Sequence, residues 1–364
     1  MKNSKKTVLL ALSGGVDSAV AAMLLKKQGY RIIAAFMKNF SDTKDPLTNQ
    51  CSWKTERNMA IKIAYALEIP FITLDFEKEY KKQVIEPMFK AYKKGQTPNP
   101  DILCNSIIKF PLLWKAAKKL KADYLATGHY ARIKKTSKGY HLLSAKDSTK
   151  DQSYFLADVT QDDLSHTLFP IGNYTKKEIR NIARKNKFLN WDKTSTRGVC
   201  FIGDVNFNKF LREKIKEKPG KVINPEGSLL GTHKGIPFYT IGQKALPSQG
   251  IMINKPSGFE QKRFYVAGKR KNNILVVAPE NHPSLKRKQI LIRKIHLINK
   301  KIRMPKRLKA RIRHLGILHS GNLKKITKGW MFTFDKPLEA LAEGQYIVFY
   351  KNQEVIGCGE MKLK

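Results

Sequence analysis

The chain contains 364 residues, which exceeds the usual size of one domain, so two or three domains are expected. Its apolar fraction of 41%, with 18 Phe, 13 Tyr and 4 Trp, is enough for packed cores and excludes an intrinsically disordered chain. The 70 Lys and Arg residues outnumber the 29 Asp and Glu residues, giving a net charge of +41. This charge favours a polyanionic partner such as nucleic acid or an acidic membrane, although a compositional bias towards lysine explains the total equally well.

No targeting signal or membrane anchor is expected from the sequence. Residues 1–12 combine a basic head with an apolar run too short for a signal peptide, and no run reaches about 18 apolar residues. We therefore expect a cytoplasmic protein whose cysteines stay reduced unless a disulfide is transient and catalytic. No CxxC pair is present, so a zinc site is not expected.

Up to about residue 210, strand-like apolar runs alternate with helical patterns. The pattern predicts strands at 7–12, 31–37, 71–75 and 124–127, and helices at 19–28 and 56–67. A capping box from Thr175 to Glu178 predicts a further helix that runs to about residue 185. Strands and helices alternating at these lengths predict an α/β fold with a doubly wound parallel sheet.

After residue 210, short strands separated by Gly- and Pro-containing turns predict an all-β region in two modules that meet near residues 279–285. Residues 281–334 hold 16 Lys and Arg and no acid. Within them, Arg307, Lys309, Arg311 and Arg313 alternate with apolar residues, so a strand would place the four cations on one face. This segment therefore predicts a nucleic-acid-binding face.

Residues 10–18, L-A-L-S-G-G-V-D-S, join the first predicted strand to the first predicted helix. The two glycines allow the backbone to approach an anion, and the amino end of the helix offers free N–H groups to a phosphate. Ser13 and Ser18 add hydroxyl donors, while Asp17 can orient the loop or hold Mg²⁺. No Gly-Lys-Ser/Thr follows, so the loop is not a Walker A motif. We predict a nucleotide phosphate site at this loop.

Two of the four cysteines lie in motifs that suit chemistry. Cys104 precedes Asn105-Ser106, a pair that could start a helix, and a helix amino end near Lys109 would favour a thiolate. Cys200 lies between two glycines in a compact loop, where Arg197 adds positive charge. A phosphate loop with two such cysteines suggests sulfur transfer, in which ATP activates a ring carbonyl and a cysteine persulfide attacks its carbon. A second cysteine is then needed to cleave the S–S bond, leaving a transient disulfide.

The loop S-G-G-V-D-S resembles the PP-loop of the ATP pyrophosphatases, which cleave ATP between the α- and β-phosphates and adenylate an oxygen. The stretch T-P-N-P-D-I-L-C-N-S-I-I-K-F at 97–110 resembles the N-P-D-x-x-C-N-x-x-I-K-F motif of the bacterial tRNA-specific 2-thiouridylases. Further resemblances extend over essentially the whole chain: A-T-G-H-Y-A-R at 126–132, K-D-Q-S-Y-F-L at 150–156, L-F-P-I-G at 168–172, V-C-F-I-G at 199–203, I-G-Q at 241–243 and E-G-Q-Y-I-V-F-Y at 343–350.

The resemblance implies an adenine nucleotide alpha hydrolase-like PP-loop domain over residues 1–210. It implies a small central β module over 211–280 and a basic, tRNA-contacting C-terminal β-barrel over 281–364. The implied activity is ATP-dependent 2-thiolation of the wobble uridine (position 34) of tRNAs for Lys, Glu and Gln, through an adenylated uridine and a cysteine persulfide. The products would be 2-thiouridine, AMP and pyrophosphate. The protein would be a monomer that receives sulfur from a relay protein or a cysteine desulfurase.

The resemblance also assigns residues. ATP, with Mg²⁺, is expected at Ala11, Leu12, Ser13, Gly14, Gly15, Val16, Asp17, Ser18, Met37 and Gly128. The target uridine is expected at Asn99, Pro100 and Asp101, with Asp101 as general acid/base. Cys104 is expected to be the nucleophile that resolves the S–S bond and Cys200 the persulfide carrier, the two forming a transient disulfide. The expected tRNA contacts are His129, Lys150, Asp151, Gln152, Arg311, Ile312 and Gln345. No metal site made by protein ligands alone is expected.

Some of these residues also have structural interpretations. His129 could be a hydrogen-bonded histidine at a strand end, residues 150–152 could form an N-cap, and Gln345 could belong to a plain hairpin turn. Ile312 has no polar group and could meet RNA only through its backbone or by packing. Cys51 and Cys358 match no motif and are interpreted as small hydrophobic residues.

Other functions fit parts of the sequence. One is a different PP-loop adenylating enzyme, such as a tRNA lysidine synthetase or an amidating synthetase, which would not need the cysteines. Another is a non-catalytic RNA-binding protein, and a third is a 2-thiouridylase whose two cysteines ligate an iron–sulfur cluster. Residues 38–57 and 244–247 depart from the family pattern, so the sequence leaves their roles open.

Overall fold

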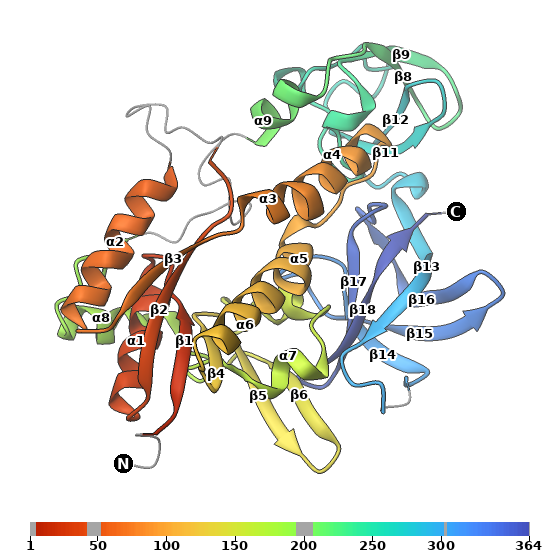
Figure 1. The fold of residues 1–364 in the computed structure, drawn as a ribbon. Coiled ribbons are helices and arrows are strands. Elements are labelled where there is room, and N and C mark those ends of the chain that lie inside the picture. Colours follow the sequence, from red (N-terminus) through yellow and green to blue (C-terminus); the bar gives the residue numbers. More distant parts are fainter. Residues whose placement is uncertain (1–4, 42–51, 194–206, 302–303, 364) are drawn as a thin grey trace.

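The computed structural model describes residues 5–41, 52–193, 207–301 and 304–363 (Figure 1). The described N-terminal part is built on a parallel sheet whose strands run in the order β3 (Phe71–Asp75), β2 (Arg31–Lys38), β1 (Thr7–Ala11), β4 (Tyr124–Thr127) and β7 (Thr167–Leu168). The strand order reverses between β1 and β4, and ligands of open α/β sheets bind at such a reversal. This sheet confirms the predicted doubly wound α/β fold.

Helices cover both faces of the parallel sheet. One face carries α1 (Val16–Lys27), α2 (Ser52–Ala66) and α8 (Lys176–Lys185), drawn on the left of Figure 1. Helix α1 begins one turn earlier than predicted, which places S-G-G-V-D-S directly at its amino end. The predicted capping box at α8 is confirmed, because Thr175 Oγ1 accepts from the Glu178 N–H and the Glu178 carboxylate accepts from the Thr175 N–H.

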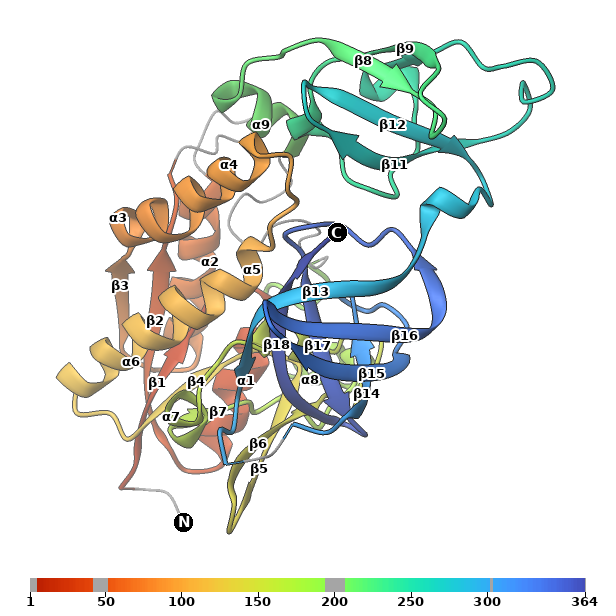
Figure 2. The ribbon, with the colours of Figure 1, turned by 90° about the vertical axis from the view of Figure 1, so that its right-hand side faces the viewer.

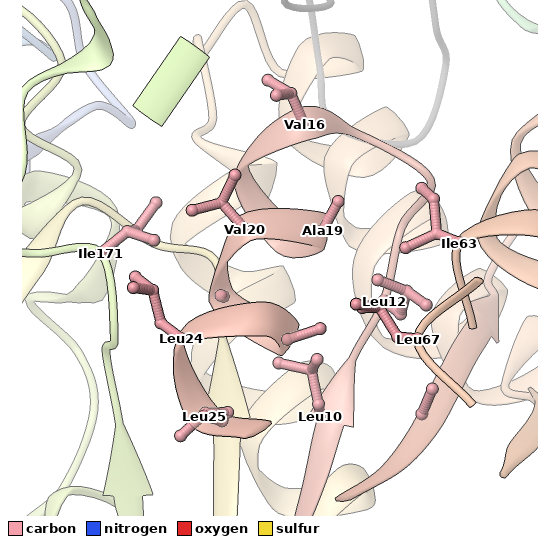
Figure 3. Close-up of a cluster of buried hydrophobic side chains, with 14 of the residues drawn as sticks. Leu10, Leu12, Val16, Ala19, Val20, Leu24, Leu25, Ile63, Leu67 and Ile171 are labelled. Atoms are coloured by element: carbon pink, nitrogen blue, oxygen red, sulfur yellow. The ribbon is translucent and has the colours of Figure 1, made fainter. Parts of the chain in front are cut away.

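The core between α1 and the sheet is mainly aliphatic. Leu10 of β1 and Leu12, one residue beyond it, belong to the same buried cluster as Val20 and Leu24 of α1 (Figure 3). Ile63 of α2 and Leu67, one residue after that helix, lie in this cluster too. Full burial of one such side chain stabilises the fold by roughly 2 kcal/mol. This packing fixes the amino end of α1 against the carboxyl end of β1.

The other face is covered by a helical segment in which the sequence predicted only a helix start after Cys104. It comprises α3 (Glu77–Tyr80), the π-helix η1 (Lys81–Ile85), α4 (Glu86–Lys93), α5 (Pro100–Leu103), the π-helix η2 (Cys104–Lys109) and α6 (Phe110–Lys119). Three short elements complete the described part up to residue 214: the 3₁₀ helix η3 (Ser153–Leu156), α7 (Gln161–Ser165) and α9 (Phe207–Lys214). Figure 1 shows α3 and α4 leading from the parallel sheet up to the second sheet.

The second sheet is small and mixed. Its strands run in the order β10 (Ile251–Ile253), β9 (Leu229–His233), β8 (Gly220–Ile223), β12 (Ile274–Pro279) and β11 (Phe264–Arg270). Two 3₁₀ turns, η4 (Ile236–Phe238) and η5 (Pro247–Gln249), connect its strands, and η6 (Pro283–Leu285) leads onward. The predicted small β module is therefore present.

The third sheet closes into a barrel, blue in Figure 2. Its order is β13 (Lys286–Leu297), β16 (Gly329–Glu339), β15 (His319–Ile326), β14 (Arg307–Arg311), β17 (Tyr346–Lys351) and β18 (Glu354–Lys362), and β18 pairs back with β13. A hairpin from the N-terminal part, β5 (Ala131–Thr136) and β6 (Gly139–Ser144), extends this sheet through β6–β18 pairing. The sequence did not predict this hairpin. Across the residues described, no helix combines the length and apolarity that a membrane crossing requires.

Candidate active site

The predicted phosphate loop lies at the carboxyl end of β1, where the strand order reverses. Gly15 is the N-cap of α1, and the first backbone bond into the helix runs from the Ala19 N–H to the Gly15 carbonyl. The N–H groups of the three residues before Ala19 therefore have no intrahelical acceptor. The Ser18 hydroxyl accepts from the Ser13 N–H at 3.2 Å and donates to the Gly15 carbonyl at 3.0 Å, which fixes the loop. The loop thus presents donors at a positive helix end, an arrangement that suits phosphate.

A cavity of about 310 Å³ opens at this loop, and we call it the β1–α1 cavity. All residues predicted to bind ATP line it except Gly14: Ala11, Leu12, Ser13, Gly15, Val16, Asp17, Ser18, Met37 and Gly128. Gly14 faces α2 instead, with φ +77°, and a Cβ on it would lie 2.4 Å from the Glu56 carbonyl oxygen. Asn39 also lines the cavity, and its Oδ1 is buried with no hydrogen-bond partner among the described residues.

Asp17 is held by two residues from distant parts of the chain. Its Oδ1 accepts from the Lys176 ammonium at 2.6 Å and from the Tyr130 hydroxyl at 2.7 Å. Burial, and then the Asp17 charge, raise the pKa of Tyr130, so this phenol stays a hydrogen-bond donor. Lys176 is the first residue of α8 and also lines the cavity, which adds a cation to the phosphate loop.

His129 lies inside the β1–α1 cavity, with only 8% of its surface exposed. Its Nδ1 lies 2.7 Å from the Thr127 hydroxyl, and its Nε2 lies 3.4 Å from the Lys109 ammonium. Because an ammonium can only donate, Nε2 accepts and the proton sits on Nδ1. Burial, and then the Lys109 charge, hold the pKa of His129 well below its usual range. The imidazole is therefore neutral and directs the Lys109 ammonium in the cavity wall.

The expected target-base segment forms the start of a helix. The Asn99 side chain caps α5 by accepting from the Ile102 N–H at 3.2 Å, and Pro100 occupies the first helical turn. The prediction that a helix begins after Cys104 is therefore wrong, because an Asn cap followed by Pro starts the helix at Pro100, before the cysteine. Cys104 begins the π-helical turn η2 instead, and its side chain is 2% exposed in an apolar cluster. Short π-helical segments inside α-helices frequently occur at functional sites.

The segment before α5 contacts both the barrel and the central β module through loop residues. Asn99 Nδ2 donates to Gln345 Oε1 at 3.4 Å, and the Gln345 amide donates to the Pro98 carbonyl at 3.4 Å. Thr97 meets the barrel through a 2.8 Å bond from its N–H to the Glu343 carbonyl, and its hydroxyl lies 3.1 Å from that of Thr240. Residues predicted separately for the target base and for tRNA, Asn99 and Gln345, are thus in contact.

The other expected tRNA contacts differ in their access to solvent. Lys150 is exposed and Gln152 is partly buried in the β1–α1 cavity, whereas Asp151 is fully buried. The Asp151 carboxylate accepts from the Arg311 guanidinium at 2.6 Å, and Arg311 lies over the Tyr350 ring. In this conformation the Asp151 carboxylate is not available to an RNA, and it holds Arg311 instead.

Strand β14 confirms the predicted alternation. Leu308 and Ala310 are buried in the barrel core, while Arg307 and Lys309 are exposed. Arg307 pairs with Asp335 at 2.7 Å on the surface, and Arg313 is exposed just beyond the strand. Ile312, also expected at tRNA, is buried. Two exposed cations, Lys309 on the strand and Arg313 just beyond it, thus carry no ion pair within the described residues.

Some expected residues fall outside the described part of the chain. Cys200 and Cys51 lie there, as do residues 42–51 of the 38–57 loop, so the separation between Cys104 and Cys200 is not given by the structure. Cys358 is described and fully buried, which confirms its interpretation as a small hydrophobic residue. Burial, and then the nearby Asp158, raise the pKa of the Cys358 thiol well above its usual range. In the described ranges, no group of three or more His, Cys, Asp and Glu could hold a metal ion.

Three lysines in the cavity were missed by the sequence reasoning as members of the nucleotide site: Lys109, Lys176 and Lys193. Lys109 belongs to the quoted I-I-K-F motif and Lys176 to the capping box, so both were already singled out for other reasons. The signal that would have found them is spatial, because they come from separate segments of the chain: Lys109 from η2, Lys176 from α8 and Lys193 from the segment after α8.

Comparison with protein families gives three matches in chain order. Residues 6–204 match the tRNA methyl transferase HUP domain, residues 208–279 the tRNA methyl transferase PRC-barrel domain, and residues 287–361 the aminomethyltransferase beta-barrel domain. Among solved structures, a complex of a 4-thiouridine synthetase with RNA and bound ATP is similar with a TM-score of 0.37 and 15% identity, over 57% of this chain and 50% of that one.

Curated relatives match nearly from end to end. The tRNA-specific 2-thiouridylase MnmA 1 of Geobacillus kaustophilus is 40% identical over 97% of this chain and 94% of its own length. The tRNA-specific 2-thiouridylase MnmA of Christiangramia forsetii is 35% identical over 97% of this chain and 99% of its own length. With the phosphate loop, the N-P-D-x-x-C-N helix and the closed barrel all in place, the chain belongs to the tRNA-specific 2-thiouridylase family.

Proposed function

We propose that this protein is a tRNA-uridine 2-sulfurtransferase, which uses ATP to convert the wobble uridine of tRNAs for Lys, Glu and Gln to 2-thiouridine. The observation that carries the proposal is one continuous helical segment. It begins at the Asn99 cap beside Gln345, passes Cys104, and reaches the β1–α1 cavity at Lys109. A rise of about 1.5 Å per residue separates the Cys104 and Lys109 positions by only about 7 Å along the helix axis. A nucleotide in the cavity and a base near Asn99 would therefore both lie close to this thiol.

The first step activates the uridine. The O2 oxygen of the base attacks the α-phosphorus of ATP, the bond to the β-phosphate oxygen breaks, and pyrophosphate leaves. Backbone donors at the amino end of α1, with Lys176 and Lys109, would stabilise the charge that develops on the phosphates. Asp101, half-buried in the first turn of α5, is the proposed acid/base for the uridine.

Magnesium fits this site as a companion of the phosphates. Mg²⁺ is usually held by one or two carboxylates together with substrate phosphates and water. Asp17 lies in the phosphate loop with 29% of its side chain exposed, so it is the residue that would hold the ion. A bound Mg²⁺ supplies charge neutralisation at the phosphates.

The sulfur steps need both cysteines. The terminal sulfur of a Cys200 persulfide attacks C2 of the adenylated uridine, and AMP leaves with the former O2 oxygen. The Cys104 thiolate then attacks the Cys200 sulfur, and the S–S electron pair moves to the sulfur on C2 to form the thiocarbonyl. A Cys104–Cys200 disulfide results, and an external thiol reductant must restore the two thiols. A sulfur relay protein or a desulfurase would reload Cys200.

Within this proposal, residues 1–210 are the catalytic domain, 211–280 the central module and 281–364 the tRNA-contacting barrel of a cytoplasmic monomer. Asn99, Pro100 and Asp101 meet the target base. Lys150, Arg311, Gln345 and the neighbouring residues named above form the tRNA contact region.

The test is mass spectrometry of nucleosides from unmodified tRNA incubated with the protein, ATP, Mg²⁺, a persulfide source and a thiol. We expect the wild-type protein to form 2-thiouridine together with AMP. Formation of 2-thiouridine should be lost in both Cys104→Ser and Cys200→Ser and retained in Cys358→Ser. A different PP-loop adenylating enzyme would keep AMP formation in both cysteine variants and yield no thionucleoside. Thiolation by an iron-containing preparation, abolished when the iron is removed, would instead support the cluster mechanism.

A further inference from the structure

A second cavity, of about 370 Å³, opens along the outer side of α8, and we call it the α8 groove. It is lined by Lys176, Lys177, Arg180, Asn181, Arg184 and Trp191. No acidic side chain is among these residues, and four of the six are cations. None of the roles assigned above uses this groove beyond Lys176.

The cations of the groove are available for a ligand. Lys176 is occupied by Asp17, but in the described ranges none of Lys177, Arg180 and Arg184 forms an ion pair. The Arg180 Nε is buried without a hydrogen-bond partner there. The one acid of the helix, Glu178, is engaged by the Thr175 cap and by Lys146. An unpartnered guanidinium nitrogen and unpaired charges facing one cavity favour an anionic ligand.

The cations form a row instead of a single cluster. Lys177, Arg180 and Arg184 are three and four residues apart, so they share one face of α8. From the first to the last, the helix rises about 10 Å. A free phosphate or pyrophosphate would engage only part of such a row, whereas a chain of phosphates can follow it.

Trp191 adds a second kind of contact. It is 41% exposed, an unusually open position for a large aromatic side chain, and it borders the same groove as the guanidinium groups. Aromatic side chains next to a cationic groove are the common means of binding single-stranded nucleic acid, because every base can stack on them. Stacking on one such ring contributes about 1–3 kcal/mol per base in alanine-substitution series, or about five- to 150-fold in affinity.

The groove also adjoins the proposed reaction centre. Lys176 lines both the α8 groove and the β1–α1 cavity, and its ammonium lies between them on Asp17. RNA held along α8 would therefore lead directly to the nucleotide cavity.

We propose that the α8 groove binds a single-stranded stretch of the RNA substrate, with a base stacked on Trp191 and successive phosphates on Lys177, Arg180 and Arg184. The assignment rests on the proposed function only in naming tRNA as the source of that stretch.

The test compares Lys177→Glu/Arg184→Glu with a matched control, Lys27→Glu/Lys62→Glu. The control makes the same charge change with exposed lysines on α1 and α2, and each pair includes one residue in the last turn of its helix. Affinity for the tRNA is measured over a range of salt concentrations, and the KM for ATP is measured in parallel. We expect the groove variant to bind at least about tenfold more weakly than the control. Its salt slope should fall by about 1.4 for two lost phosphate contacts, and its KM for ATP should stay within about twofold.

Tryptophan fluorescence supplies the second arm. A single-stranded RNA oligomer should quench the wild-type protein, and the portion contributed by Trp191 should disappear in Trp191→Phe, which retains RNA affinity. Trp191→Ala should bind RNA about tenfold more weakly. Inorganic pyrophosphate, added at equal phosphate concentration, should not displace the oligomer.

The outcomes separate the two proposals. Equal tRNA affinity of the groove variant and its control, or displacement of the oligomer by pyrophosphate, would overturn the RNA assignment of the groove while leaving thiolation intact. A wild-type protein that forms no 2-thiouridine but shows the groove-dependent RNA binding would overturn the proposed function and support the groove.

Discussion

Lys109 and His129 illustrate how one hydrogen bond can set the role of a residue. The neutral His129 accepts from Lys109 and donates to Thr127, so the ammonium is held in the cavity wall. His129 was expected to touch tRNA, but its burial beside the phosphate loop favours a different role, in which His129 positions Lys109. Such a pair is invisible to sequence reasoning, because its two members lie on different elements and meet only after the sheet has formed.

We expect Lys109→Met to lower kcat for tRNA-dependent AMP formation by about a hundredfold, because a preorganised cation at the phosphates is lost. Lys109→Arg, which keeps the charge, should recover part of that loss. Lys115→Met, on the exposed side of α6, is the matched control and should change nothing. Steady-state kinetics decide the matter, and a Lys109→Met enzyme with normal kcat would show that the ammonium has no part in the reaction.

His314 gives a pH dependence of stability. Burial, only partly opposed by Asp151 and reinforced by Arg311, lowers the pKa of His314 to about 4. The His314 ring packs against Phe155 in a tilted arrangement, with centroids 4.2 Å apart. Because the folded pKa lies below the unfolded value of about 6.5, the unfolded chain binds more protons between these limits. The stabilising contribution is therefore complete above pH 6.5 and is lost as the pH falls towards 4.

Denaturant unfolding at pH 7 and pH 5 tests this sign. The wild-type protein should lose free energy of unfolding at pH 5, and His314→Gln should lose measurably less. Equal losses in the two proteins would place the titrating group elsewhere.

At the scale of elements, the sequence patterns located the strands well. The predicted ranges 71–75 and 124–127 coincide with β3 and β4, and the period of two at residues 307–311 is confirmed in β14. Within residues 77–119 the sequence predicted only a helix start after Cys104. The apolar residues of this segment pack into two different buried clusters, so they follow no single helical period. The wrong helix start at Cys104 has a local cause, because Asn105-Ser106 could cap a helix but Asn99-Pro100 already starts it.

The three cations of strand β14 and Arg313 just beyond it are not equivalent. Lys309→Glu/Arg313→Glu should weaken tRNA binding similarly for all tRNA sequences and reduce the salt slope by about 1–2, because these exposed groups can meet phosphates.

Arg311→Ala should instead cost about 3–5 kcal/mol of stability by leaving the buried Asp151 carboxylate unpaired. Binding titrations together with denaturant unfolding separate the two effects. If Arg311→Ala unfolded like the wild-type protein, the Asp151–Arg311 pair would not be structural.

At the scale of the whole molecule, the barrel and the N-terminal part share a core. Val348, Tyr350 and Val355 of the barrel belong to the same buried cluster as Leu9 and Phe110, and β6 adds to the barrel sheet. The sequence predicted a sequential arrangement of modules and missed this exchange. A hairpin of one region that completes the sheet of another depends on contacts between residues about 200 positions apart, which no local pattern encodes.

We therefore expect residues 1–210 alone not to fold to a stable unit, because removing the barrel exposes β6 and one side of that cluster. Calorimetry should give no cooperative transition for the fragment, whereas the full chain should unfold the N-terminal part and the barrel together. A fragment that melts cooperatively at the temperature of the full chain would contradict the shared core.

If two cysteines transfer sulfur to an ATP-activated uridine, each transfer leaves one disulfide behind, and a single-turnover experiment measures this stoichiometry. The protein is loaded with an isotopically labelled persulfide, freed of excess donor, and mixed with ATP and tRNA without reductant. Peptide mapping and nucleoside mass spectrometry then quantify both products. We predict one Cys104–Cys200 disulfide for each labelled 2-thiouridine formed. Labelled 2-thiouridine in the same yield with both cysteines recovered as free thiols would contradict the account.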